Sequence, residues 1–281
     1  MRLLSEPRPE YVEQCLSCGS AFFYFGASNK VSHNDQYSDE ARYERYIEHA
    51  NESSMAQRHE ETLETLRLLL TDVEDPTLFD VGAGVGNFLA KARERGFRIA
   101  GNEVSQPAID QCRRRHDIRL ALGDNLQAIA ANFGGHDAVT MWCVIAHVDD
   151  PDEFLRGARA LLRPGGVLFL STPRYCTIDR VALMLRRLTR DRYRSVFDRR
   201  INEKHRRQYS RRGIEALLLR ERFMPIAIKS EIGYGLRMES YLDSIGFPRF
   251  LSKPIGRALE VSAKAGFLPR NVLNVYARAV G

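Results

Sequence analysis

Residues 78–96 read LFDVGAGVGNFLAKARERG, and this stretch decides the fold. It opens with a short apolar run typical of a buried parallel strand and ends in an amphipathic helical pattern. Between them, Gly82, Gly84 and Gly86 allow a sharp turn and a close approach of the backbone to a ligand. The free N–H groups of the following helix point into the same space. The stretch therefore predicts a strand, a glycine turn and a helix around a compact ligand.

Two acidic residues indicate which ligand the turn binds. A Gly-x-Gly-x-Gly turn alone is a weak signal, because dinucleotide-binding proteins also begin with a strand, a glycine turn and a helix. Asp80 stands directly before the glycines, where a carboxylate repels a pyrophosphate and suits a cationic or amino-acid-bearing ligand. Glu103 ends the next apolar run, where it can accept hydrogen bonds from both hydroxyls of a ribose.

From residue 77 onward, strand and helix patterns alternate, which predicts an α/β fold with a doubly wound parallel sheet. The expected strands are 77–81, 98–102, 118–121, 137–142 and 166–172, and the expected helices are 85–95, 105–115, 125–132 and 151–162. Ligands bind at the carboxyl ends of such strands. The residues singled out by their chemistry, Asp80, Glu103, Asp124 and 142–147, all fall at those ends.

Taken together, these motifs resemble the class I S-adenosylmethionine-dependent methyltransferases, and within them the ubiquinone-biosynthesis and small-molecule O-methyltransferase branch. The resemblance covers residues 77–223, about half the chain. It rests on the Asp80 glycine motif, Glu103 in GNEVS, Asp124 in ALGDN, CVIAHVDDPDEFL at 143–155 and LLRPGGVLFLSTPR at 161–174. It implies a Rossmann-like, mostly parallel seven-stranded sheet and S-adenosyl-L-methionine as the cofactor.

The resemblance also implies which residues hold the cofactor. The glycine turn should carry the methionine moiety, Glu103 the ribose, and Asp124 with the neighbouring amide the adenine edge. A helix N-cap is the alternative role for Asp124. The expected cofactor-binding residues are Asp80, Gly82, Gly84, Gly86, Glu103, Asp124, Asn125, Trp142 and Cys143.

Three residues are candidates for catalysis. His147 stands where the resembled family has a histidine after the fourth strand, and a neutral imidazole can take a hydroxyl proton near pH 7. A structural histidine is the competing interpretation. His205 and Tyr209 resemble acceptor-site residues of the family, and their alternative is a loop that caps the helix starting after Ser210.

The sequence predicts no metal at this site. Quinone-type relatives carry two glutamates before the histidine, linked to a magnesium requirement, and the corresponding positions here are Cys143 and Ala146. Magnesium prefers oxygen ligands, so two would be missing. Asp149 and Asp150 lie nearby and could replace the missing ligands, although Asp150 is also typical of the start of a helix.

The domain organisation is expected in three parts. Residues 1–36 resemble half of a zinc ribbon with one Cys15-x-x-Cys18 knuckle, which is either a zinc site with His33 as an extra ligand or a vestigial apolar hairpin. Residues 37–72 form a helical cover. Its Tyr37, Tyr43 and Tyr46 either line the pocket or belong to the core. Residues 73–281 form the methyltransferase domain, with acceptor-cap insertions near 174–209 and 233–268.

Charge is the other informative property of this 281-residue chain, whose net charge is +6. Residues 186–212 contain twelve Lys or Arg against three acidic residues. This basic stretch is a solvated cap, a site for an anionic acceptor, or a surface for nucleic acid or membrane. No apolar run approaches the roughly 20 residues of a membrane span and no signal peptide is evident, so a cytoplasmic location is expected.

The predicted function is O-methylation of a hydroxyl on a saccharide, glycolipid precursor or related small molecule. One alternative is an RNA or N-methyltransferase that uses the basic stretch, but an appended RNA-binding module and an amino-methylating motif are both missing from the sequence. Another alternative is a catalytically silent cofactor-binding subunit. The expected partner is a small-molecule acceptor, with peripheral membrane contact and a dimer as open alternatives.

Overall fold

The computed structural model describes residues 11–24, 52–188, 205–233, 239, 242–243, 248–267 and 269–280. Several sequence-based expectations lie outside these residues. They are the pocket tyrosines at 37, 43 and 46, the extra ligand His33, and the part of the basic stretch at 189–204. No helix within the described part of the chain combines the length and the apolar character that crossing a bilayer requires.

A seven-stranded sheet forms the centre of the molecule, as the sequence predicts. Its strands lie in the order β5-β4-β3-β6-β7-β10-β9. The first five run parallel to one another, and β10 is antiparallel to both of its neighbours. In that order the strands span Ala121–Leu122, Arg98–Glu103, Thr77–Val81, His136–Trp142, Leu162–Pro173, Val272–Ala279 and Phe223–Glu231.

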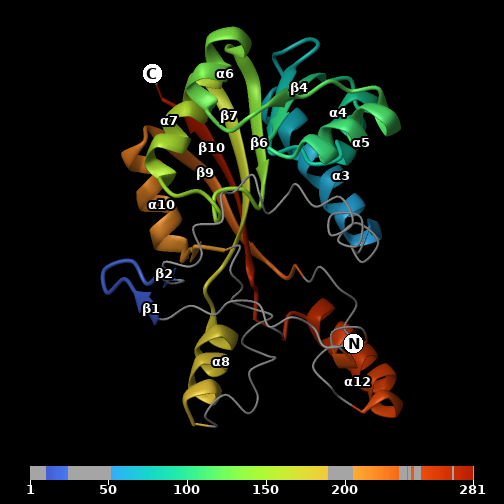
Figure 1. The fold of residues 1–281 in the computed structure, drawn as a ribbon, viewed down its shortest axis with the longest axis vertical. Coiled ribbons are helices and arrows are strands. Elements are labelled where there is room, and N and C mark those ends of the chain that lie inside the picture. The colour runs from blue at the N-terminus through green and yellow to red at the C-terminus, as the bar shows by residue number, and fades with distance from the viewer. Residues whose placement is uncertain are drawn as a thin grey trace.

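Helices cover both faces of this sheet (Figure 1). On one face lie α3 (Glu52–Leu69), α4 (Asn87–Glu94) and α5 (Gln106–His116), and on the other lie α6 (Leu126–Phe133), α7 (Pro151–Leu161) and α10 (Arg211–Arg220). Each face has its own apolar core: one joins Leu63 and Phe88 to Phe169, and the other joins Leu155 and Ile214 to Leu170. The doubly wound layering is therefore confirmed.

The two remaining helices lie beyond the central sheet. Helices α8 (Thr177–Leu188) and α12 (Arg249–Lys264) both lie toward the lower end of the molecule in Figure 1. Of the expected elements, the strand at 118–121 differs most, because it is observed as the two-residue strand β5 at Ala121–Leu122.

A small second sheet attaches the N-terminal segment to the segment that precedes α10. Strands β1 (Tyr11–Gln14) and β2 (Ala21–Tyr24) form an antiparallel hairpin, with Cys15 and Cys18 in its turn. Strand β2 also pairs with β8 (Arg207–Gln208), and Ala21 lies opposite Gln208. The N-terminal hairpin therefore borders the segment that carries His205.

Candidate active site

The glycine turn has the conformation that the sequence predicts. Gly82, Gly84 and Gly86 have φ angles of 67°, 56° and 78°, a region that side chains with a Cβ rarely adopt. Space is also short at two of them. A Cβ added at Gly82 would lie 2.8 Å from Val144 Cγ2, and one added at Gly86 would lie 2.3 Å from Cys112 Sγ. The turn is therefore closely packed at Gly82 and Gly86.

Glu103 fixes this turn to the neighbouring strand. Its Oε2 accepts a hydrogen bond from the backbone N–H of Gly84 at 2.8 Å. Its Oε1 accepts from the N–H groups of Val104 at 2.8 Å and Ser105 at 3.0 Å. The side chain is buried at the end of β4. It therefore lies beside the glycine turn, where the resemblance places the carboxylate that holds the cofactor ribose.

Asp80 is a buried acid behind the turn. It is 2% exposed and accepts a hydrogen bond from Thr140 Oγ1 at 2.6 Å. Burial raises the pKa of Asp80 to about 7, and the nearby Glu103 acts in the same direction, while the Thr140 hydroxyl opposes them. Because a neighbouring cation favours the carboxylate form, this site suits a ligand that carries positive charge.

The expected adenine-binding pair lies at the carboxyl end of β5. Asp124 and Asn125 are both exposed in the structure. The N-cap of α6 is Asn125, whose Oδ1 accepts from the N–H of Ala128 at 3.0 Å. The helix-cap role considered for Asp124 therefore falls to its neighbour, and the Asp124 carboxylate faces solvent.

Trp142 packs against helix α3 at the end of β6. Its ring lies 4.7 Å from that of His59 and 4.8 Å from that of Phe169. The guanidinium carbon of Arg58 lies 5.4 Å from the centre of the same ring. This contact anchors the helical cover to the sheet, beside the strand end where the cofactor is expected.

Sequence reasoning missed Arg58 as a site residue. Its Nη2 donates to Ser171 Oγ at 3.0 Å and to Asn274 Oδ1 at 3.2 Å, across two strands of the sheet. A half-buried guanidinium at this place could hold a carboxylate, such as that of a methionine moiety. The signal was present, because Arg58 stands four residues before the buried Thr62 on the inward stripe of α3.

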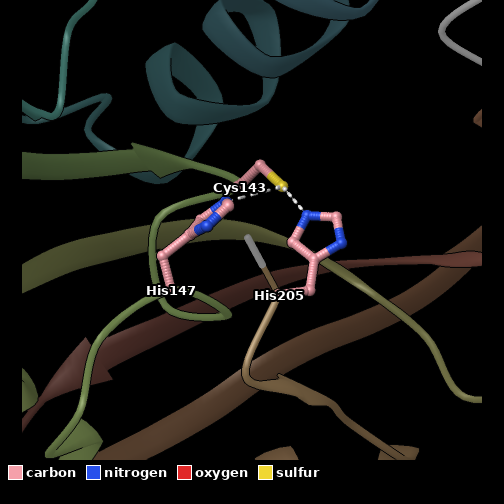
Figure 2. Close-up of side chains that lie close together, drawn as sticks. All are labelled: Cys143, His147 and His205. Atoms are coloured by element: carbon pink, nitrogen blue, oxygen red, sulfur yellow. Dashed lines mark hydrogen bonds between the residues drawn. The ribbon is translucent and has the colours of Figure 1, made fainter. Parts of the chain in front are cut away.

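The structure brings three side chains of the predicted site together. Cys143 Sγ lies 3.6 Å from His205 Nε2 and 3.9 Å from His147 Nε2, and the two imidazole ring centres are 4.8 Å apart (Figure 2). All three are half-buried. Burial raises the pKa of the Cys143 thiol to about 11, and Arg58 opposes this shift.

Backbone contacts hold the cluster in place. Cys143 has a left-handed φ of 58°, which is uncommon for a residue other than glycine. Its segment and the one before β8 are joined directly. The backbone hydrogen bonds run from Cys143 N to Ser171 O at 2.8 Å, from His147 N to Val144 O at 2.9 Å and from Arg206 N to Ala146 O at 2.9 Å.

Tyr209 lies apart from this cluster. It is 5% exposed within the core, and its hydroxyl donates to the carbonyl of Ile145 at 3.5 Å. Burial raises the pKa of its phenol to about 12. The next residue, Ser210, caps α10 by accepting from the N–H of Gly213 at 2.9 Å. The capping interpretation of this segment therefore agrees with the structure.

The acidic pair after the cluster has structural contacts. Asp149 forms an ion pair with Arg206 at 2.9 Å, and its carbonyl accepts from Arg207 Nη2 at 2.8 Å. Asp150 Oδ1 caps α7 by accepting from the N–H of Asp152 at 2.9 Å. These two described arginines of the basic stretch thus use their charge within the chain.

Comparison with known proteins agrees with this geometry. Residues 47–222 match the family model described as a methyltransferase domain. A ubiquinone biosynthesis O-methyltransferase of Caulobacter vibrioides is 34% identical over 104 residues. That match covers 35% of this chain and 41% of the relative, so the chain spans less than half of that protein's length.

Solved structures share the fold at low sequence identity. A chain from the complex between the Haloferax volcanii Trm112 methyltransferase activator and the putative methyltransferase has a TM-score of 0.58 at 15% identity, covering 89% of this chain and 98% of that one. A putative sarcosine dimethylglycine methyltransferase from Galdieria sulphuraria has a TM-score of 0.54 at 15% identity, covering 81% and 86%. These likenesses concern the fold alone.

The chain therefore belongs to the methyltransferase-domain family. Its sheet order and glycine turn are those of a class I methyltransferase, an enzyme whose cofactor is S-adenosylmethionine.

Proposed function

We propose that the protein transfers a methyl group from S-adenosylmethionine to a hydroxyl oxygen of a small-molecule acceptor. In this reaction an oxygen lone pair forms the new C–O bond as the C–S bond breaks, the sulfonium becomes a neutral thioether, and the hydroxyl proton leaves. Alignment of oxygen, methyl and sulfur is the main task of the protein.

One observation carries this proposal, namely the position of the Cys143, His147 and His205 cluster. Cys143 directly follows β6, and a Cβ added at Gly82 would lie 2.8 Å from the next residue, Val144. The glycine turn should hold the methionine end of the cofactor, so the reactive methyl would lie close to the cluster. An acceptor hydroxyl in the same space would meet groups that bind oxygen and take part in proton transfer.

The hydroxyl proton has two routes out of this site. One is direct transfer to His147, the base that the sequence predicts. The other is loss of the proton from a hydroxyl bound to a metal ion, and the geometry of the cluster favours this second route. Both routes require His147, so its removal should lower turnover in either case.

A saccharide, glycolipid precursor or related metabolite is the acceptor class we propose. The name of the Caulobacter vibrioides relative, an O-methyltransferase, supports oxygen as the methylated atom. The saccharide preference rests on the half-ribbon resemblance of the N-terminal segment. The basic stretch at 186–212 would suit an acceptor that carries phosphate or carboxylate.

The proposal is tested by following labelled methyl from S-adenosylmethionine into separated small-molecule, lipid, RNA and protein fractions. Label in nuclease-resistant saccharide or lipid is the expected result. Label confined to RNA or protein would overturn the small-molecule proposal. Cofactor binding without transfer to any fraction would favour the silent-subunit alternative.

A matched pair of variants connects the transfer to the cluster. His147→Ala should leave cofactor affinity intact and lower turnover by about 100-fold or more. His136→Ala is the control, because His136 lies at the opposite end of the same strand. If both variants keep the turnover of the wild type, His147 takes no part in methyl transfer.

A further inference from the structure

We propose that Cys143, His147 and His205 bind a zinc ion. They are the group of three potential ligands that the described residues bring within metal-binding distance, since Sγ and the two Nε2 atoms lie within 4.8 Å of one another. Figure 2 shows that a nitrogen of each ring faces the Cys143 sulfur. The three side chains come from two segments that the Arg206 to Ala146 hydrogen bond joins.

The two sulfur–nitrogen distances suit tetrahedral zinc. Zinc with sulfur at about 2.3 Å and nitrogens at about 2.0–2.1 Å places sulfur about 3.6 Å from each nitrogen. The observed separations are 3.6 Å for His205 and 3.9 Å for His147. The first therefore matches directly, and the second requires a shift of about 0.3 Å, within reach of a small rotation of the His147 ring. The unusual φ of 58° at Cys143 is the kind of backbone conformation that collects at functional sites.

Magnesium does not fit the same residues. It demands oxygen ligands in a nearly octahedral arrangement, whereas this group offers one sulfur and two nitrogens. Thiolate and imidazole together select zinc and similar late transition metals. The carboxylates of Asp149 and Asp150 are engaged with Arg206 and with the start of α7.

Three protein ligands leave one position of a tetrahedral zinc ion open, which is the arrangement of catalytic rather than structural sites. Resting on the proposed function, we assign this position to the acceptor hydroxyl. A bound zinc ion lowers the pKa of a hydroxyl and fixes its oxygen. The proton that leaves would pass to solvent, and His147 would act as a ligand. Zinc binding itself does not depend on this assignment.

The first experiment measures metal content without reference to activity. The full chain is purified without an affinity tag, in a Cys15→Ser/Cys18→Ser background that removes the thiols of the N-terminal knuckle. Element analysis after equilibration with zinc and gel filtration should give one zinc per chain. The Cys143→Ser variant should lose it. Retention of less than about a tenth of an equivalent by the background protein would overturn the proposal.

Cobalt replaces zinc as a spectroscopic probe in the second experiment. Titration of the metal-free protein with Co²⁺ should produce a thiolate charge-transfer band and the strong visible absorption of tetrahedral cobalt. Cys143→Ser should lose the charge-transfer band, and His205→Ala should bind cobalt at least about 100-fold more weakly. Cys176→Ser is the matched thiol control and should be unchanged. An identical spectrum for Cys143→Ser would overturn the site. Circular dichroism checks that each variant is folded. If Cys143→Ser does not fold, the cobalt affinity of His205→Ala tests the site instead.

The outcomes separate this inference from the proposed function. One zinc per chain without methyl transfer to any acceptor would support the metal site and contradict O-methylation. Full methyl transfer by the chelator-treated, metal-free protein would support O-methylation and overturn a functional zinc ion.

Discussion

The carboxylate of Glu103 accepts a hydrogen bond from the backbone N–H of Gly84 at 2.8 Å. This contact joins the end of β4 to the turn that follows β3. Because the same carboxylate also accepts from two N–H groups of its own loop, it is held in place before any ligand binds. The carboxylate that we expect to bind the cofactor ribose is therefore already oriented in the free protein.

Replacing Glu103 by Ala should weaken S-adenosylmethionine binding by about 100-fold or more. Hydrogen bonds to a charged group contribute about 1.5–3 kcal/mol each, and the substitution also frees the turn. Calorimetric titration measures the loss. Glu94→Ala, at an exposed acid of α4, should bind normally. Normal affinity in both variants would show that Glu103 does not hold the cofactor.

Gly86→Ala should destabilise the protein by about 2 kcal/mol or more. The alanine would have to adopt a left-handed φ, and its Cβ would overlap with Cys112 Sγ. Urea unfolding measures the change. Gly135→Ala is the control, since its φ is 91° but its Cβ would meet nothing within 4 Å; it should cost only about 1 kcal/mol. The Gly86→Ala/Cys112→Ala double variant should recover part of the loss. An equal loss of unfolding free energy in Gly86→Ala and Gly135→Ala would contradict the overlap with Cys112 Sγ.

Stability should depend on the protonation of Asp80. Its folded pKa of about 7 lies above the unfolded value of about 3.9, so the folded state binds the proton more tightly. The stabilising contribution is complete below about pH 4 and disappears as the pH rises through about 7.

Denaturant titrations at several pH values test this expectation. The difference in unfolding free energy between the wild type and Asp80→Asn should fall by the order of a few kcal/mol from about pH 4 to about pH 8. The sign follows from the raised pKa. A difference that stays flat, or rises with pH, would show that Asp80 is ionised in the folded protein throughout.

Ser210→Ala should affect both stability and turnover. Its hydroxyl caps α10 and donates to the carbonyl of Cys18, so the change removes a helix cap and a contact of the N-terminal hairpin. We expect a loss of about 1 kcal/mol in unfolding free energy. A lower kcat at unchanged cofactor affinity should accompany it, because the hairpin borders the His205 segment. Ser17→Ala, in the same knuckle, should change neither. If Ser210→Ala lowers the unfolding free energy but leaves kcat unchanged, the hairpin does not contribute to catalysis.

The sequence predicts the central fold well because its signals are local. Apolar runs followed by glycine or acidic residues identify the strands, and the amphipathic pattern of each connecting helix identifies the side of the helix that packs on the sheet. Strand β5 is the exception. Only Asn102 and Glu103 pair with Ala121 and Leu122, so the apolar pattern at 118–121 did not locate the short edge strand.

The candidate site is only partly predictable. Spacing along the chain identifies the glycine turn and Glu103, but the Cys143 to His205 contact joins residues 62 positions apart. That contact depends on how the segment before β8 folds back onto the end of β6, which no periodicity encodes. Arg58 was overlooked for a different reason: although it lies on the inward stripe of α3, a charged residue on a helix usually faces solvent.

The pairing of the N-terminal hairpin with β8 also affects the order of folding. The hydrogen bond between Ser210 and Cys18 spans 192 residues, so the hairpin leaves the ribosome long before its docking surface exists. Contacts of such long range form slowly, because the intervening chain must first be ordered. A nascent chain that ends before residue 205 therefore contains the glycine turn and its neighbouring strands, whereas β8, the docking partner of the hairpin, is made only with the last third of the protein.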